Sequence, residues 1–311
     1  MQVKILGSAA GGGFPQWNCA CPNCRSLRAG TFRGKARTQT QFAISADSEH
    51  WFLLGASPDL RAQIESSPDL HPHPSDNGTR HSPISGAILL NADIDHILGL
   101  LLMRELQPLH IYSTNSVRQI VEDNSMFAML RRVEGQLSWS SISLTKWFPL
   151  FGPTHTKIAL RCRALSLGTH FPAYVPSERL SQLDPRESSL GLIVETSSKK
   201  RLAYLPAVPK ITDELLSELD SVDVLLFDGT FWSDDELIRI QGSGQTAQQM
   251  GHVSVSSPSG SLAQLAHLKH PRKIYLHINN TNPMLNEDSS EYRQVRKPGW
   301  ETAEDGWQFE L

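Results

Sequence analysis

Short apolar segments separated by polar turns run along the whole chain, and many have the length and composition of strands. Strands are predicted where β-branched, aromatic and leucine residues cluster between turn-forming residues. These segments are "VKILGS" (3–8), "QTQFAIS" (39–45), "WFLLGAS" (51–57), "ISGAILL" (84–90), "LHIYST" (109–114), "ALRCRALSL" (159–167), "VDVLLFDG" (222–229) and "KIYLHIN" (273–279). In addition, 189–206 predicts a hairpin turning at "SSKK", and "EDGWQFEL" (304–311) predicts a short closing strand.

Helical spacing of apolar residues appears between these strands. Helices are predicted in "SPDLRAQIES" (57–66), with Ser57 as its cap, from about Asp95 onward, and in 114–124, 212–221 and 256–268. The stretch from Ser66 to Pro83 is rich in Pro, Ser, Asp, Asn and His, so an exposed loop is predicted there. Strands and helices alternate without a regular βαβ period or a repeat, which favours one mixed α/β sandwich domain over residues 1–311.

Composition narrows the possible partners. The chain has 311 residues, 39% of them hydrophobic and 20% charged, with a formal net charge of -3. This balance is typical neither of an acidic disordered protein nor of a general nucleic-acid binder, so a small molecule or a short peptide is the expected partner. The N-terminus lacks the apolar run of a signal peptide, and no segment has the length of a membrane span, so we expect a cytoplasmic protein without membrane insertion. The sequence makes no prediction of the oligomeric state.

Three of the four cysteines lie in "QWNCACPNC", where Cys19, Cys21 and Cys24 form a C-x-C-x-x-C pattern. The preceding glycines, 11–13, do not lead directly into a helix, which argues against a dinucleotide-binding loop. Three soft sulfur donors on a tight turn suit structural zinc, which needs a fourth donor from elsewhere. We therefore predict a zinc loop at 16–25.

Two other interpretations of the cysteines fit less well. A redox dithiol needs only Cys21 and Cys24, which would leave Cys19 superfluous. An iron–sulfur cluster usually needs four cysteines, and Cys162 lies alone in a predicted strand.

A second group of candidate ligands follows the predicted strand at 84–90. The stretch "LLNADIDHILG" contains Asn91, Asp93, Asp95 and His96, which is the pattern H-x-H-x-D-H with its first two histidines replaced. That pattern, the following "ILGL" and the late strand "IYLHIN" resemble the metallo-β-lactamase superfamily. The longer stretches "GSAAGGGFPQWNCACPNC", "NADIDHILGLL", "FDGTFW" and "MGHVSV" resemble a branch that takes part in the biosynthesis of the redox cofactor pyrroloquinoline quinone (PQQ). The resemblance spans the chain and implies a metallo-β-lactamase-like four-layer αββα sandwich.

The departures from the superfamily pattern change the expected chemistry. Its hydrolases hold two metals, whereas here the first two histidines are missing and Ala207 lies near the place of the bridging aspartate. The resemblance leaves Asp95, His96 and His277 as ligands of a single metal. Two imidazoles and one carboxylate suit non-haem iron(II) and oxygen chemistry, whereas hydrolysis with a bridging hydroxide would lose half of its metal clamp.

Other side chains have more than one interpretation. His252 in "MGHVSV" is expected to be a further ligand, an acid–base group or a support for a ligand, and His170 and Asp228 are weaker candidates. Taken singly, Asp95 and His96 could simply cap a helix, and His277 could be a buried structural histidine. The histidines at 71, 73 and 81 lie among prolines and polar residues, which favours a solvated loop over a metal site.

The resemblance implies a role in making PQQ from a glutamate and a tyrosine of a precursor peptide. The resulting hypothesis is an iron oxygenase that uses dioxygen to hydroxylate the tyrosine ring of a Glu-Tyr-derived precursor, with Fe²⁺ at Asp95, His96 and His277 and structural Zn²⁺ at the cysteines. Two alternatives are a non-catalytic carrier or transport helper for PQQ or its precursor, and a metallo-β-lactamase-like hydrolase.

Overall fold

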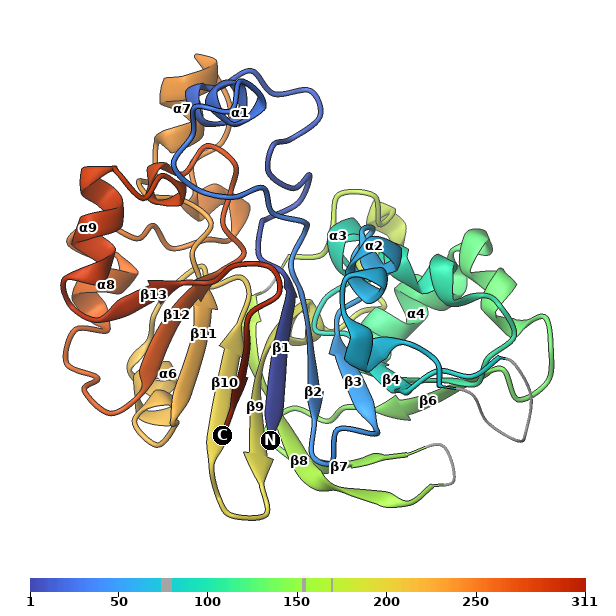
Figure 1. Cartoon of the computed structure of the whole chain (residues 1–311). Coiled ribbons are helices and arrows are strands. Elements are labelled where there is room, and N and C mark those ends of the chain that lie inside the picture. Colours follow the sequence, from blue (N-terminus) through green and yellow to red (C-terminus); the bar gives the residue numbers. More distant parts are fainter. Residues whose placement is uncertain (74–79, 153–154, 169) are drawn as a thin grey trace. The chain divides into compact units, whose positions relative to one another are not determined.

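The computed structural model describes residues 1–73, 80–152, 155–168 and 170–311, and it shows an α/β protein (Figure 1). Two compact units can be distinguished. The first contains residues 1–6, 41–199 and 306–311, and the second contains residues 7–40 and 200–305. Each unit therefore combines segments that are far apart in the sequence. The single domain over 1–311 stays a prediction.

The first unit contains a seven-stranded mixed sheet. Its strand order is β14 (Gln308–Glu310), β1 (Gln2–Gly7), β2 (Gln41–Ser45), β3 (Trp51–Leu54), β4 (Ile84–Ile88), β5 (Leu109–Ser113) and β6 (Leu137–Ser141). Strands β3 to β6 run parallel, whereas β2 pairs with β3 and β1 with β14 in antiparallel fashion. The N-terminal amine of Met1 donates a hydrogen bond of 2.7 Å to the carbonyl of Leu311. Both ends of the chain therefore lie side by side in this unit (Figure 1).

Helices of the first unit cover an apolar cluster beside this sheet. They are α2 (Leu60–Glu65), α3 (Ile94–Ile97) and α4 (Asn115–Asp123), whereas α5 (Ser177–Leu180) buries none of its residues. Trp51, Leu53 and Ile111 from the strands share the cluster with Val117 of α4. The hydroxyl of Thr114 accepts a hydrogen bond from the Val117 N–H and so caps α4. The cluster fixes the sheet beneath the segment that carries Asp95 and His96.

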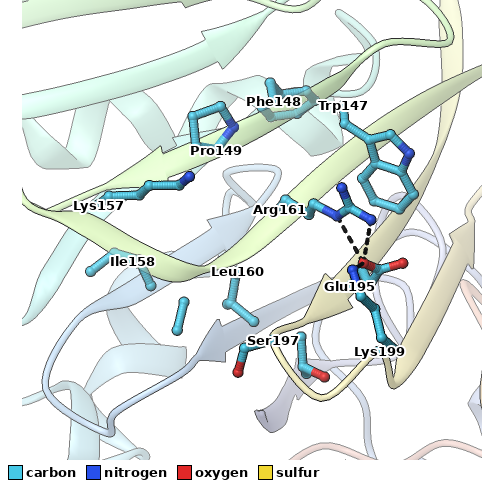
Figure 2. Close-up of a pocket in the computed structure, with 12 residues that line it drawn as sticks. Trp147, Phe148, Pro149, Lys157, Ile158, Leu160, Arg161, Glu195, Ser197 and Lys199 are labelled. Carbon is cyan, nitrogen blue, oxygen red and sulfur yellow. Dashed lines mark hydrogen bonds and ion pairs between the residues drawn. The ribbon is translucent and has the colours of Figure 1, made fainter.

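Three antiparallel strands complete the first unit: β7 (Trp147–Phe151), β8 (Lys157–Gly168) and β9 (Ser189–Thr196). Cys162 is fully buried on β8, as expected of a strand thiol. These strands line a hollow of about 400 Å³. Arg161 lies there between Trp147 and Glu195 (Figure 2). The Arg161 Nε–H donates to Glu195 Oε1 at 2.8 Å, and its guanidinium lies 4.4 Å from the centre of the Trp147 ring.

The second unit is built on parallel strands. They are β10 (Arg201–Leu205), β11 (Val224–Asp228), β12 (Arg272–Leu276) and β13 (Trp300–Thr302). Its helices are α1 (Pro22–Arg28), α6 (Asp213–Leu219), α7 (Glu236–Gln241), α8 (Ser261–Gln264) and α9 (Ser290–Arg296). Because parallel strands end at the same edge of a sheet, Asp228 at the end of β11 lies opposite Leu276, the residue before His277.

Strands form in every segment where the sequence predicts them, but two local predictions in the first unit are wrong. Helix α2 begins at Leu60 with Asp59 as its N-cap, and Ser57 Oγ instead accepts a hydrogen bond from the Asp59 N–H at 3.1 Å. The predicted exposed loop at 66–83 contains a 3-10 turn, and Leu70 in that turn is buried. The part of this loop at 74–79 lies outside the described residues.

No helix in the described ranges combines the length and the apolar character that a membrane crossing requires. The cytoplasmic location stays a prediction.

Replacing Arg161 with Met should lower the free energy of unfolding by about 2 kcal/mol, as measured by urea denaturation. The side chain of Glu195 is 0% exposed, and the substitution removes its ion pair with Arg161, whereas the ion pair with Lys199, which is 69% exposed, remains. Lys157→Met is the matched control, because Lys157 lies on the same strand and has no ion pair with any described residue; its effect should stay within about 0.5 kcal/mol. Equal effects of the two substitutions would contradict a stabilising role for the buried pair.

Candidate functional site

Asp95 and His96 lie together in the first unit, at the start of α3. The helix begins at Ile94, so Asp95 occupies its first turn, and Asp95 Oδ2 lies 3.9 Å from His96 Nε2. His96 is buried, and Gly55 (φ 80°) packs so closely that a Cβ atom there would lie 3.2 Å from His96 Nδ1. A side chain at position 55 would therefore crowd the imidazole ring.

Asn91 and Asp93 replace the first two histidines of the superfamily pattern, and the structure gives Asn91 a role within its own loop. Its side chain is buried, and Oδ1 accepts a hydrogen bond from the Asp93 N–H at 3.3 Å. The backbone of Asn91 forms a β-bridge with Ser189, and the hydroxyl of Tyr174 donates to the carbonyl of Ala92. Burial raises the pKa of Tyr174 to about 12, so the hydroxyl keeps its proton at neutral pH. These contacts fix the loop that leads to Asp95.

His277 lies in the second unit, directly after β12, with a left-handed backbone (φ 59°). Such a conformation costs on the order of 1–3 kcal/mol in a residue other than glycine and occurs often at functional sites. The next residue, Ile278, holds this backbone in place: its N–H donates to Ser8 at 3.0 Å, and its carbonyl accepts from Ala10 at 2.9 Å. The segment that carries the imidazole is therefore strained, and two backbone hydrogen bonds hold it in place.

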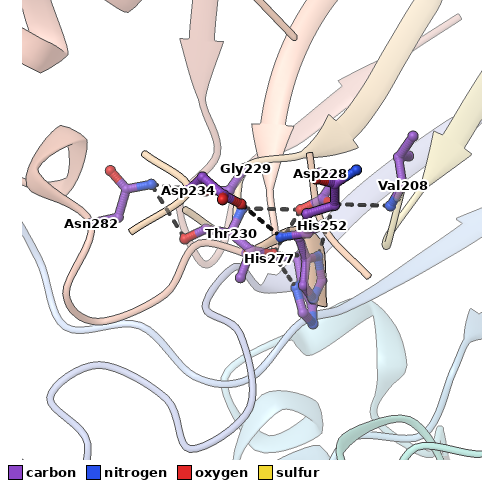
Figure 3. A network of polar contacts seen from close by, with 9 residues as sticks. Val208, Asp228, Gly229, Thr230, Asp234, His252, His277 and Asn282 are labelled. Carbon is purple, nitrogen blue, oxygen red and sulfur yellow. Dashed lines mark hydrogen bonds and ion pairs between the residues drawn. The ribbon is translucent and has the colours of Figure 1, made fainter. Parts of the chain in front are cut away.

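Asp228 is the centre of a buried polar network around His277 and His252 (Figure 3). Its carboxylate accepts hydrogen bonds from the Val208 N–H (3.0 Å), the Thr230 N–H (3.0 Å), the Thr230 hydroxyl (2.7 Å) and His252 Nδ1–H (2.8 Å). Burial alone would raise the pKa of this carboxyl, but the charge of His252 and the hydrogen bonds outweigh burial and lower it.

These contacts decide the role of Asp228. Ligand atoms of Asp228, His252 and His277 lie within 4.8 Å of one another, a spacing that would also suit a metal ion. However, four hydrogen bonds use the four acceptor positions of the carboxylate. These hydrogen bonds favour a role for Asp228 in orienting its neighbours over a role as a metal ligand.

The network also sets which ring nitrogen of each histidine carries the proton. The Thr230 hydroxyl has one proton, and it donates that proton to Asp228, the stronger acceptor. Thr230 Oγ1 then accepts from His277 Nδ1–H at 2.9 Å, while His252 Nδ1–H donates to Asp228. With Nδ1 protonated in both rings, Nε2 is the nitrogen of each histidine suited to bind a metal or exchange a proton. The two rings stack, with their centres 5.6 Å apart.

The cysteines gather at the N-terminus of α1, in the second unit. Cys21 is the N-cap of this helix, Pro22 is its first residue, and Cys24 lies fully buried in its first turn. The sequence predicted a turn here but not the helix. The three sulfur atoms lie within 4.8 Å of one another. Burial raises the pKa of Cys21 to about 12, whereas hydrogen bonds from the Cys21 N–H and from neighbouring side chains outweigh burial and lower the pKa of Cys19.

Asn280 is the site residue that the sequence analysis missed. Its side-chain amide nitrogen lies 3.2, 3.7 and 3.3 Å from the sulfur atoms of Cys19, Cys21 and Cys24, respectively. The two ends of an amide are nearly the same in shape, so a flip would turn Oδ1 toward a cation at the centre of the sulfurs. The signal in the sequence was the asparagine-rich "HINNTNP" that begins at His277. Three thiols and one amide oxygen fit a tetrahedral zinc ion.

The remaining candidates have simpler surroundings. His170 is exposed. His71 Nε2 lies 3.1 Å from the carbonyl oxygens of Ile64 and Glu65 at the end of α2, consistent with a structural role. Asp95 and His96 belong to the first unit, whereas His252 and His277 belong to the second. The combination of Asp95, His96 and His277 as one ligand set stays a prediction.

Comparisons with known proteins identify the family. Residues 50–278 match the family model described as a beta-lactamase superfamily domain. Coenzyme PQQ synthesis protein B of Methylorubrum extorquens (strain PA1) is 40% identical over 312 residues, and the protein of that name from Pseudomonas entomophila (strain L48) is 40% identical over 314 residues; both alignments cover 100% of both chains.

A solved structure agrees with these relatives. The crystal structure of Zn²⁺-bound PqqB from Methylobacterium extorquens is 39% identical, covers 100% of both chains and superimposes with a TM-score of 0.90. This similarity confirms the predicted metallo-β-lactamase-like α/β fold. On these grounds the chain belongs to the coenzyme PQQ synthesis protein B family, within the beta-lactamase superfamily.

Proposed function

We propose that this protein acts in PQQ biosynthesis as a non-haem iron oxygenase that hydroxylates the tyrosine ring of a Glu-Tyr-derived precursor. The names of its relatives support the pathway. The main support for oxygenase chemistry is that this chain has fewer metal-binding side chains than the H-x-H-x-D-H pattern of the superfamily provides. The side chain of Asn91 accepts a hydrogen bond within its own loop and is not counted as a metal ligand. The candidate ligands that remain are Asp95 and His96 in the first unit and His277 in the second.

In this proposal, Asp95, His96 and His277 hold one iron(II) ion. Iron(II) bound by two histidines and one carboxylate keeps open positions and supplies the chemistry that activates dioxygen. Thr230 keeps the proton of His277 on Nδ1 and so directs Nε2 to the metal. The ring of His277 is therefore oriented with Nε2 as its donor atom.

His252 is assigned the acid–base role. Asp228 accepts its Nδ1–H and stabilises the charged imidazolium, so Nε2 can take a proton from the phenol and return it. The pairing resembles the way a buried aspartate orients a catalytic histidine in hydrolases.

Cys19, Cys21, Cys24 and Asn280 are assigned to zinc. The zinc named for the solved relative supports this assignment, as do the distances from Asn280 to the three sulfur atoms. The ion would join the start of α1 to the segment that follows His277 and so brace the zinc loop.

Incubation of the iron(II)-loaded protein with ¹⁸O₂, ascorbate as the reductant and a glutamyl-tyrosine peptide should give a product with one ¹⁸O atom on the tyrosine ring, detected by mass spectrometry. The protein loaded anaerobically but kept from oxygen is the control. Cleavage that takes up oxygen from H₂¹⁸O instead would identify a hydrolase. Tight binding of PQQ or the peptide without turnover would identify a carrier.

Two independent metal sites should respond separately to substitution. Cys19→Ser should remove zinc and leave iron bound, whereas His277→Ala should remove iron and leave zinc bound, as measured by metal content per chain. Cys162→Ala is the matched control, because this thiol is buried in β8 and belongs to neither group of candidate ligands, so the substitution should change neither metal. Loss of both metals in either site variant would contradict the assignment of separate ligand sets.

Thr230→Val should weaken iron binding by about 10–100-fold, because it removes the hydroxyl that holds His277 Nδ1. The measurement is competition with a chelator of known affinity. Thr302→Val is the matched control: its hydroxyl is buried in the same unit without a hydrogen-bond partner among the described residues, so its loss should leave metal affinity unchanged. Unchanged affinity in Thr230→Val would show that this hydroxyl does not position the ligand.

A further inference from the structure

The zinc loop borders a large hollow in the second unit. The hollow has a volume of about 820 Å³, and Cys19, Cys21 and Asn280 all contribute to its lining. Cys19 is also partly exposed. The cysteine cluster is therefore open on one side, whereas purely structural zinc sites are usually closed by four strong ligands.

The fourth neighbour of the cysteines is the weakest donor of the set. A neutral amide such as that of Asn280 binds zinc less strongly than a thiolate or an imidazole, the ligands that usually close such sites. Asn280 lies 3.2–3.7 Å from the three sulfur atoms and also lines the hollow. A ligand that enters from the hollow would therefore reach the zinc ion at the position of the Asn280 amide.

The chemistry of the hollow indicates what that ligand would be. Phe231, Leu237, Ile240 and Met250 form an apolar wall, and both Ile240 and Met250 remain 41% exposed. Exposed apolar side chains around a hollow are typical of a binding surface. Arg25 is the one charged residue of the described lining, and it has no ion pair with any described residue. A guanidinium binds a carboxylate through two hydrogen bonds.

We propose that the fourth position of the cysteine-bound zinc is a ligand-binding position that takes the carboxylate of an apolar organic acid. Arg25 pairs with the same carboxylate, and the apolar wall holds the body of the molecule. The ligand displaces Asn280 from the metal and makes no covalent bond. Two kinds of molecule carry such a carboxylate. One is a free apolar acid, and the other is a peptide whose C-terminal residue is apolar. The proposal rests on zinc occupancy of the cysteines, as assigned above, and not on the oxygenase activity.

The test uses the full chain with Co²⁺ in the cysteine site, because cobalt absorbs visible light in a way that depends on its ligands. Titration with 4-phenylbutyrate should change the cobalt spectrum to saturation, and the matched amide, 4-phenylbutyramide, should bind at least 10-fold more weakly. A dipeptide Ala-Phe with a free or an amidated C-terminus distinguishes the peptide source from the free acid.

Two variants separate the parts of the site. Arg25→Ala should weaken the binding of 4-phenylbutyrate at least 10-fold, whereas Arg33→Ala should leave it unchanged, because Arg33 is an exposed arginine of the same unit that pairs with Asp288. Asn280→Cys should close the site with a fourth thiolate and abolish the response. Equal binding of acid and amide, or an unaffected Arg25→Ala variant, would overturn the proposal.

The sulfur-to-cobalt absorption bands distinguish a wrong zinc assignment from a wrong ligand-binding assignment. A cobalt-loaded protein without sulfur-to-cobalt absorption would refute the zinc assignment and this proposal with it. Normal sulfur-to-cobalt bands that no acid changes would refute this proposal alone. Neither result bears on the ¹⁸O₂ experiment.

Discussion

The buried carboxylate of Asp228 is the constraint on which the arrangement of the second unit depends. A carboxylate removed from water is tolerated only when its acceptor positions are filled, and here they are filled from the ends of β10 and β11 and from the segment before α8. These three segments must converge for Asp228 to remain ionised. Thr230, fixed in this way, then holds His277. One buried charge thus determines the orientation of both histidines.

A short stretch of backbone joins this network to the zinc loop. Asn280 is three residues after His277, and between them the Asn279 N–H donates to the carbonyl of Thr230 at 3.0 Å. From the zinc loop, the side chain of Asn23 donates to the carbonyls of Asn280 and Asn282 at 3.1 and 3.0 Å. The strained backbone at His277 is therefore held from both sides, by the polar network and by the cysteine loop.

The sequence predicted the strands well because their apolar residues cluster between clear turn signals, as in β4 and β11. It missed β6, "LSWSS", because three of its five residues are serines and the strand is only partly buried. It also missed α1, because Cys21, Pro22 and Asn23 resemble a turn; in fact Pro22 occupies the first helical position, where its missing N–H has no cost.

For the candidate site, the sequence identified the individual chemistry-bearing residues better than their roles. The spacing of Cys19, Cys21 and Cys24 was sufficient to predict a cluster, and the structure brings them together. Asn280 was not predictable, because it is 256 residues from Cys24 and an amide is not a usual zinc ligand. Similarly, a single aspartate at the end of a strand gave no sign that Asp228 would bind Val208, Thr230 and His252 at once.

The pairing of β1 with β14 has a consequence for how this chain can be handled. The amine of Met1 donates a hydrogen bond to the carbonyl of Leu311, so residues 1 and 311 are direct neighbours in space. A few added residues would suffice to join the two ends, and new ends could then be opened in a surface turn such as that between Thr196 and Arg201. We expect a circular permutant with its new ends in that turn to keep the pairing of β1 with β14.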